Sequence, residues 1–167
     1  MKLLSLLISS ILIAAASAST YNYLYCPGTA TAVTGKGLEW QLGADLPDPA
    51  PTIDGPTVTD LALTTDAGNP RDYDDCLHVV NLDALTDHAF SIKVTSTSAS
   101  TDFTTLNMRL FDDLDAEQAV LDLKTLNDEV TGLTILGGKT WRVMFELNPI
   151  SSPLGTAVTF EVTLTYE

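Results

Sequence analysis

The side chains most able to do chemistry in this chain are two histidines, two cysteines and an excess of acidic residues. A hydrolase needs a nucleophile beside a general base, and only His78 and His88 could supply a histidine base. His78 lies in a strand-like stretch, residues 76–80, and His88 precedes another. The sequence contains no Gly-x-Ser-x-Gly, His-Glu-x-x-His, phosphate-binding loop or Gly-x-Gly-x-x-Gly pattern. We therefore expect that the protein is not an enzyme.

Two acidic clusters could bind a hard cation through carboxylate oxygens. Their members are Asp72, Asp74 and Asp75 in the first cluster and Asp112, Asp113 and Asp115 in the second. Calcium is coordinated by such oxygens on flexible loops, but neither cluster has the spacing of the twelve-residue calcium-binding loop. Calcium is the only cofactor that the sequence suggests, and solvated loop acids are the alternative.

The first 18 residues have the three-part anatomy of a secretory signal peptide. Lys2 gives a basic start, residues 3–16 are apolar or small, and Ala16-Ser17-Ala18 is a small-x-small cleavage pattern. The apolar run is shorter than the roughly 20 residues of a membrane-spanning helix. We expect a secreted protein, outside the cell or at its surface, with no membrane contact after the leader is removed.

The mature chain of about 150 residues has the size of one domain. Its organisation is expected to be a leader over 1–18, an extended segment over 19–36 and a domain over 37–167. The net charge is −14. Nucleic acid and anionic membranes repel such a chain, so neither is an expected partner.

Alternating apolar and polar residues predict β-strands in most of the domain. The pattern is clearest over residues 156–166, 141–147 and 90–94. Further strands are predicted over 57–64, 76–82, 103–111 and 130–136, with proline- and glycine-rich breaks between them. Many short strands separated by turns indicate an all-β, jelly-roll-like β-sandwich.

Two connections invite a more specific prediction. Gly137-Gly138 joins two strong strand patterns and predicts a tight hairpin. Residues 112–121 allow either a short helix, capped by the aspartates at its start, or a loop followed by a short strand.

The start of the mature chain is unusually aromatic. Tyr21, Tyr23 and Tyr25 share one parity, so a strand would carry them on one face. Pro27-Gly28 is expected to end that strand, and residues 29–34 form a second extended piece. A short terminal strand of this kind can fold onto its own sheet or add to a neighbour's sheet. The second arrangement gives a head-to-tail contact that does not close, which makes a fibre.

Several features occur together in this layout: a secretory leader, a short N-terminal strand, and the small-residue segment 28–33. Strands with threonine-rich faces follow, such as 90–95, and the strands 141–146 and 160–164 close the domain. This layout resembles the family of secreted β-sandwich filament subunits that includes the bacterial TasA biofilm-matrix protein, the archaeal bundling pilins and the cannula proteins of hyperthermophilic archaea.

The resemblance implies donor-strand complementation, in which the N-terminal strand of one subunit fills a groove in the next. Subunits of that kind form pili that bundle cells in biofilms. Carried over to this chain, the donor is residues 19–26, and the partner is a second copy in a homopolymer. The residues expected to anchor the donor strand are Tyr21, Tyr23, Leu24 and Tyr25.

The main alternative is a monomeric secreted module that binds a glycan or an envelope protein, because β-sandwiches host many such roles. A polar groove lined by aromatic side chains would favour it. Cys26 and Cys76 are expected to form a disulfide in an oxidising exterior. The bridge is expected within one subunit, and a bridge between subunits is the alternative if Cys26 moves with an exchanged strand.

Overall fold

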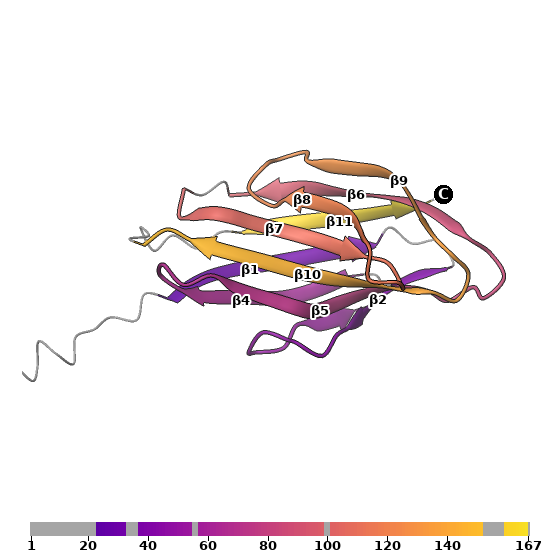
Figure 1. Ribbon diagram of the computed structural model, residues 1–167, viewed down its shortest axis with the longest axis horizontal. Helices are drawn as coiled ribbons and strands as arrows, with labels where there is room; N and C mark the ends of the chain where they lie inside the picture. Colours follow the sequence, from indigo (N-terminus) through magenta and orange to yellow (C-terminus); the bar gives the residue numbers. More distant parts are fainter. Residues whose placement is uncertain (1–22, 33–36, 55–56, 99–100, 152–158, 167) are drawn as a thin grey trace, which may run out of the picture.

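The computed structural model describes residues 23–32, 37–54, 57–98, 101–151 and 159–166, and its regular elements are all β-strands (Figure 1). The strands are β1 Tyr23–Ala32, β2 Leu38–Leu42, β3 Thr52–Asp54, β4 Thr57–Asp66, β5 Arg71–Asn81, β6 His88–Thr97, β7 Phe103–Phe111, β8 Glu117–Asp122, β9 Glu129–Ile135, β10 Thr140–Pro149 and β11 Phe160–Tyr166.

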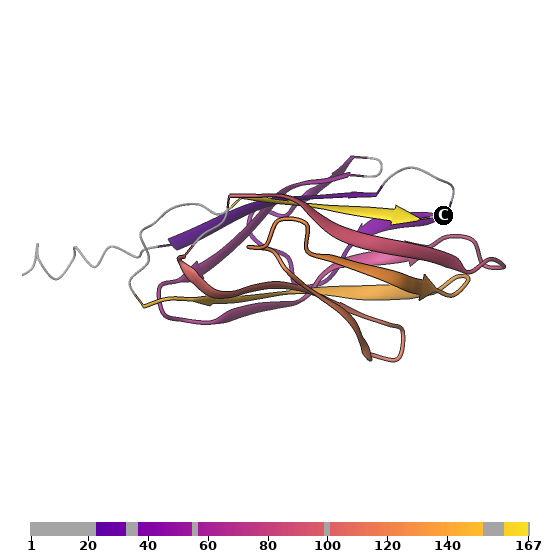
Figure 2. The ribbon, with the colours of Figure 1, turned by 90° about the horizontal axis from the view of Figure 1, so that it is seen from above.

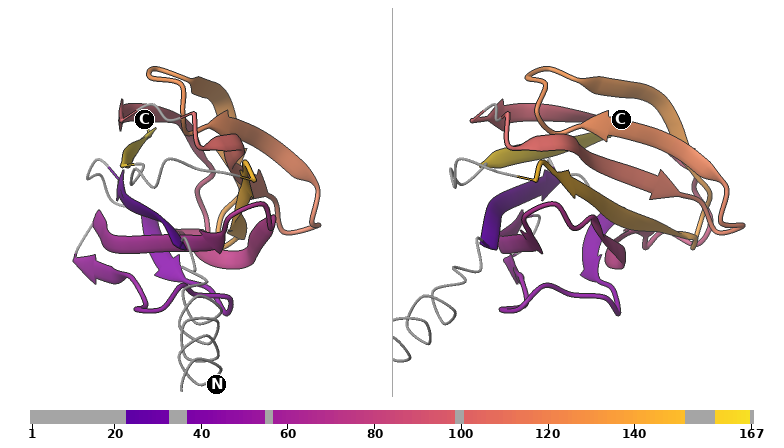
Figure 3. Two further views of the ribbon diagram at one scale, coloured as in Figure 1. Left: turned by 90° about the vertical axis from the view of Figure 1, so that its left-hand side faces the viewer. Right: turned by 60° about the vertical axis from the view of Figure 1, so that its left-hand side comes forward.

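The strands form two sheets that pack face to face, so the predicted β-sandwich is confirmed. The six-stranded sheet has the order β3-β4-β1-β11-β6-β9, and the five-stranded sheet has the order β2-β5-β10-β7-β8. Figures 2 and 3 show the two sheets as facing layers. Most neighbouring strands are antiparallel, but β1 and β11 run parallel.

The alternation of side chains along the strands explains the core. On β6, Phe90, Ile92 and Val94 point inward and are buried, whereas the residues between them are more exposed. Aromatic rings then connect the two sheets across the core. The ring centroids of Phe90 and Trp141 lie 5.3 Å apart, and those of Phe145 and Phe160 lie 6.1 Å apart. Burial of the apolar side chains of the whole core supplies most of the favourable free energy of folding.

The hairpin predicted at Gly137-Gly138 is wrong. The strands on either side, β9 and β10, lie in different sheets, where β9 pairs with β6 and β10 pairs with β5 and β7. The two glycines therefore carry the chain from one sheet to the other. A short glycine turn joins two strands in sequence, but the pairing partners depend on which buried faces must meet.

For residues 112–121 the structure contains the loop followed by a strand, and not the helix. The Asp112 carboxylate accepts backbone hydrogen bonds from Leu114 and Ala116, both at 2.9 Å, and thereby holds a turn. Strand β8 follows, with Ala119 and Leu121 buried on one face. An aspartate side chain that binds nearby backbone N–H groups competes with helix formation, which explains this outcome.

The break predicted at Pro27-Gly28 is also wrong, because β1 continues through both residues to Ala32. Pro27 lies opposite Ala62 of β4, and pairing with β11 begins only at Gly28. Proline has no N–H to donate, and it is tolerated where one edge of a strand has no partner. The N-terminal element is thus one ten-residue strand rather than two pieces.

Candidate functional site

The candidate site is the position of β1 in the middle of the six-stranded sheet. Residues Tyr23 to Gly28 pair antiparallel with β4, where Tyr23 lies opposite Asp66 and Gly28 opposite Leu61. From Gly28 to Ala32 the strand also pairs with β11, in parallel. We call the space between β4 and β11, which β1 fills, the slot.

A short connection at the end of β1 joins this strand to the rest of the domain. The residues after β1 lead to β2, which belongs to the other sheet, and the following described residue is Gly37. Because β1 is the first strand, it could leave the slot while the other strands keep their positions in the two sheets. With β1 removed, β4 and β11 would have unpaired backbone edges, and such edges readily accept another strand.

The floor of the slot requires small residues in β1. A Cβ atom at Gly28 would lie 2.2 Å from Cζ of Phe160, and Ala30 is 1% exposed. On the β4 side, Leu61 and Leu63 are fully buried. The ring of Phe160 therefore occupies the space that a side chain at position 28 would need, so glycine there is a steric requirement.

The β4 wall contains a bulge next to this contact. Pairing between β1 and β4 shifts register between Gly28 and Ala30, and Asp60 of β4 has a φ of 58°. A bulge of this kind places two residues of one strand opposite one residue of its partner. It keeps Leu61 and Val58 both buried in the core on either side of the irregularity.

The β4 wall is also fixed by a tyrosine from the opposite sheet. Tyr73 of β5 is fully buried, and its hydroxyl accepts a hydrogen bond from Thr64 N at 3.0 Å and donates one to Thr64 O at 3.1 Å. Because β3 pairs with β4 only as far as Thr59, these backbone groups of Thr64 lie beyond the end of β3. Tyr73 thus holds the wall of the slot in place.

Replacing Tyr73 with phenylalanine is expected to lower the free energy of unfolding by about 1–3 kcal/mol, because two backbone groups of Thr64 lose their partner. Arg71 lies 4.4 Å from the ring centroid, and phenylalanine would keep that contact. Urea denaturation should therefore show a lower midpoint with an unchanged m-value. An unchanged midpoint would mean that water replaces the hydroxyl at no cost.

The predicted anchors of the donor strand lie partly within the described residues. Tyr23, Leu24 and Tyr25 belong to β1 and pair with Asp66, Thr65 and Thr64 of β4. Tyr21, like the predicted leader over 1–18, lies outside the described residues. The segment predicted as the donor, residues 19–26, thus overlaps β1 from Tyr23 to Cys26, and the paired strand extends six residues beyond Cys26.

The two cysteines belong to different sheets. Cys26 of β1 pairs with Leu63 of β4 in the six-stranded sheet, whereas Cys76 lies on β5 in the five-stranded sheet. Cys76 is a fully buried free thiol, so the predicted Cys26–Cys76 disulfide is not formed in this structure. Burial raises the pKa of the Cys76 thiol to about 12, and a protonated thiol is a poor nucleophile.

The residues of the first acidic cluster form hydrogen bonds with nearby parts of the chain. The Asp75 carboxylate lies 2.6 Å from Nε2 of His78 and accepts a hydrogen bond from Ala44 N at 3.1 Å. The backbone N–H of Asp74 donates to the Asp45 carboxylate at 2.9 Å. These contacts connect β5 to the loop after β2, which is a structural role.

The second acidic cluster is used in the same way. Asp113 forms an ion pair with Lys139 at 2.7 Å, and this contact holds the pKa of the Asp113 carboxyl below its ordinary value. Asp115 pairs with Arg142 on β10, and Asp112 holds the turn before β8. In the described part of the chain, no three His, Cys, Asp or Glu side chains are grouped to hold a metal ion. The structure thus assembles neither predicted calcium site.

Asp72 of the first cluster is expected to destabilise the folded state. Desolvation raises the pKa of its carboxyl, and the neighbouring carboxylates of Glu146 and Asp74 raise it further. Glu146 lies directly opposite Asp72 on β10. Two like charges in directly opposite positions of a sheet destabilise the folded state.

Replacing Asp72 with asparagine is expected to raise the free energy of unfolding at pH 7 by about 0.5 kcal/mol, since solvent screens this exposed site. A raised pKa in the folded state lowers stability as the pH rises above the carboxyl's unfolded value. The gain should therefore disappear below about pH 3, where the carboxyl is protonated in both states. Urea denaturation at several pH values measures it. Asp54→Asn, which removes the same charge on the other sheet, is the control and should show no comparable gain.

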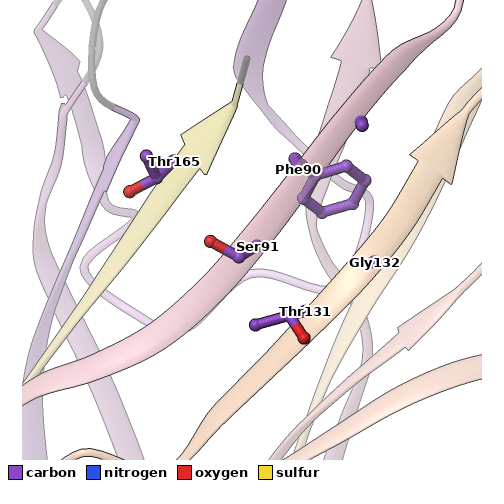
Figure 4. Close-up of a pocket in the computed structure, with 6 residues that line it drawn as sticks. Phe90, Ser91, Thr131, Gly132 and Thr165 are labelled. Carbon is purple, nitrogen blue, oxygen red and sulfur yellow. The ribbon is translucent and has the colours of Figure 1, made fainter.

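The two histidines do not form a common site. His78 lies on β5 of the five-stranded sheet beside Asp75, and His88 begins β6 of the six-stranded sheet. A shallow pocket of about 270 Å³ lies instead on the outer side of β6, β9 and β11, lined by Ala89, Phe90, Ser91, Thr131, Gly132 and Thr165. Figure 4 shows its hydroxyl groups on neighbouring strands. Phe90 is only 3% exposed, so the pocket lacks the open aromatic surface that the binding-module alternative predicts.

Comparison with known proteins adds no assignment. The sequence matches no protein-family model and no curated protein. Within the described residues, none of the structure is a helix with the length and apolar character needed to cross a membrane.

Proposed function

We propose that this protein is a structural subunit of an extracellular filament that polymerises by exchange of strand β1. The observation that supports the proposal is the position of β1: it comes first among the strands in the chain but lies in the interior of the six-stranded sheet. In the single chain β1 fills its own slot. In the filament, β1 of one subunit fills the slot of the next and makes the same backbone pairs.

The exchange is close to neutral in contact energy, because the same strand meets the same slot in both states. Gly28 would face Phe160 of the neighbour, and Gly28 to Ala32 would pair with the neighbour's β11. Additional contacts between subunits can then decide between the closed chain and the polymer. Domain swapping of identical elements follows the same principle.

The expected donor differs from the one that the resemblance to filament subunits implied. Residues 19–26 alone would provide only half of the pairs with β4 and none of the pairs with β11. The whole of β1, Tyr23–Ala32, contains the residues that pair on both sides. We therefore assign the donor to the whole strand and the connection to residues 33–37.

Electron microscopy of negatively stained protein tests the proposal. The chain beginning at Ser19 is expected to form fibres, and a chain beginning at Pro27 should form few or none, because it lacks half of the β4 pairs. Fibres of equal abundance from both chains would contradict strand exchange. Monodisperse monomers from both chains would instead support a secreted binding module.

A further inference from the structure

Three leucines at one end of the sandwich are exposed. They lie on two neighbouring loops, with Leu82 54% exposed, Leu85 96% exposed and Leu136 50% exposed. Leu82 and Leu85 belong to the β5–β6 loop and Leu136 to the β9–β10 loop, and both loops lie at the right-hand end in Figure 1. We call these three residues the leucine patch.

The loops that carry the leucine patch are held together. Buried Asn81 donates hydrogen bonds from its side-chain nitrogen to Ile135 O and Leu136 O, both at 3.2 Å. The backbone N–H of Gly138 donates to Asp83 O at 3.0 Å. The leucines are thus presented on a fixed surface, and their exposure costs free energy unless another surface covers them.

The connection that follows β1 ends beside this patch. Gly37, its last residue, accepts a hydrogen bond from Leu82 N at 2.7 Å. Between Ala32 and Gly37 there are five Cα–Cα steps, which reach at most about 18 Å. When β1 is exchanged, Gly37 of the donor subunit must therefore lie within about 18 Å of Ala32 in the acceptor's slot.

This short reach determines which ends of the two subunits meet. Strand β1 itself is about 30 Å long, and it runs toward the end of the sandwich where the β5–β6 and β9–β10 loops lie. A donor body placed beyond the opposite end of the acceptor would be too far away for the connection. From the reach of this connection and the exposure of the leucines, we infer that the leucine patch of the donor packs against the acceptor at the end of the sandwich where the acceptor's slot holds the last residues of β1. The partner is a second copy of this chain.

This inference rests on the proposed strand exchange and replaces the simple head-to-tail contact expected from the sequence. Successive subunits place the same end near one another, either around a common axis or in a closed pair. The apolar contact also suits a chain of charge −14, because two copies repel elsewhere on their surfaces.

Measuring the protein concentration at which assembly begins, by sedimentation, tests the inference. Leu85→Asp is expected to raise that concentration at least about tenfold, because a buried leucine contact is replaced by a charge. Leu126→Asp is the matched control: Leu126 is 54% exposed on the β8–β9 loop, and its replacement adds the same charge. It should leave assembly unchanged, and both variants should keep the melting temperature of the monomer.

The possible outcomes separate the inference from the proposed function. Equal assembly of both variants and the parent chain would overturn the leucine-patch contact and leave strand exchange standing. Inhibition by Leu126→Asp alone would place the contact elsewhere and would also overturn it. Closed pairs in place of fibres, still sensitive to Leu85→Asp, would support the patch and contradict the filament. A parent chain that never assembles would overturn both.

Discussion

Replacing Gly28 with valine is expected to abolish assembly and to lower the free energy of unfolding of the single chain by about 3 kcal/mol. The first added carbon would lie 2.2 Å from the ring of Phe160, a separation at which the ring or the strand must move. Overpacking of a filled core typically costs about 1–3 kcal/mol, and an aromatic ring leaves little room to relax. Urea denaturation and fibre yield measure the two effects.

A matched control and a rescue make this prediction specific. Thr29→Val makes a similar increase in apolar character at the adjacent position, which is partly exposed, and should change stability by no more than about 0.5 kcal/mol. Combining Gly28→Ala with Phe160→Leu should recover part of the stability that Gly28→Ala loses, because the smaller side chain leaves room. Full stability and normal fibres in Gly28→Val would show that β1 does not occupy the slot as described.

Removing β1 is expected to have the other large effect. A chain that begins at Val33 retains every other strand but leaves β4 and β11 without their shared partner. Most of the stability of a typical domain, about 5–15 kcal/mol, should be lost, because the core beneath Phe160 opens to water. A synthetic peptide with the sequence of residues 23–32 should restore cooperative unfolding when added in excess.

The peptide experiment contains its own control. A peptide with valine in place of Gly28 meets the same steric conflict with Phe160 and should not restore folding. Circular dichroism in the aromatic region can follow binding through Trp40 and Trp141, which are both buried in the core. If the truncated chain unfolds like the full chain without any peptide, β1 is dispensable and the slot is not a functional site.

Much of the fold could be predicted because it depends on local alternation of side chains. Strand β7 has the predicted bounds, residues 103–111, and the inward faces of β6, β10 and β11 follow the predicted parity. These strands are long and have one buried face, so the period of two is clear. The short strands β2 and β3 give too few residues for a pattern and were not predicted.

The pairing of strands depends on contacts between distant residues, which local patterns do not contain. Strand β9 precedes β10 by a short turn but lies in the other sheet, and β1 lies beside β11 from the far end of the chain. The sequence marked residues 28–33 as a segment of small residues, but only the position of the Phe160 ring explains why Gly28 must be small. Tyr73 gave no signal at all, because its role depends on the backbone N–H and C=O of Thr64, which lies in the other sheet.

The acidic clusters show why neighbours in sequence need not form a site. Consecutive residues of a strand point to opposite sides, and the paired aspartates contact different partners rather than one common ion. Asp113 meets Lys139, Asp115 meets Arg142 and Asp75 meets His78. Composition correctly indicated a highly acidic chain, but it could not indicate which acids would be paired.

The central claim is that β1 of one subunit occupies the slot of another, and a pair of cysteines tests it directly. Thr29 and Glu161 lie opposite each other in the parallel pair of β1 and β11. Such neighbouring positions meet the Cα separation that a disulfide needs, about 4.4–6.8 Å. The double variant Thr29→Cys/Glu161→Cys, with Cys26→Ser to remove a competing thiol, should be allowed to assemble and then be oxidised.

A denaturing gel without reductant then distinguishes the two states of β1. Strand exchange predicts a ladder of covalently linked chains that collapses to a single band after reduction. Only single chains, each with an internal bridge and unchanged at any protein concentration, would show that β1 stays in its own subunit.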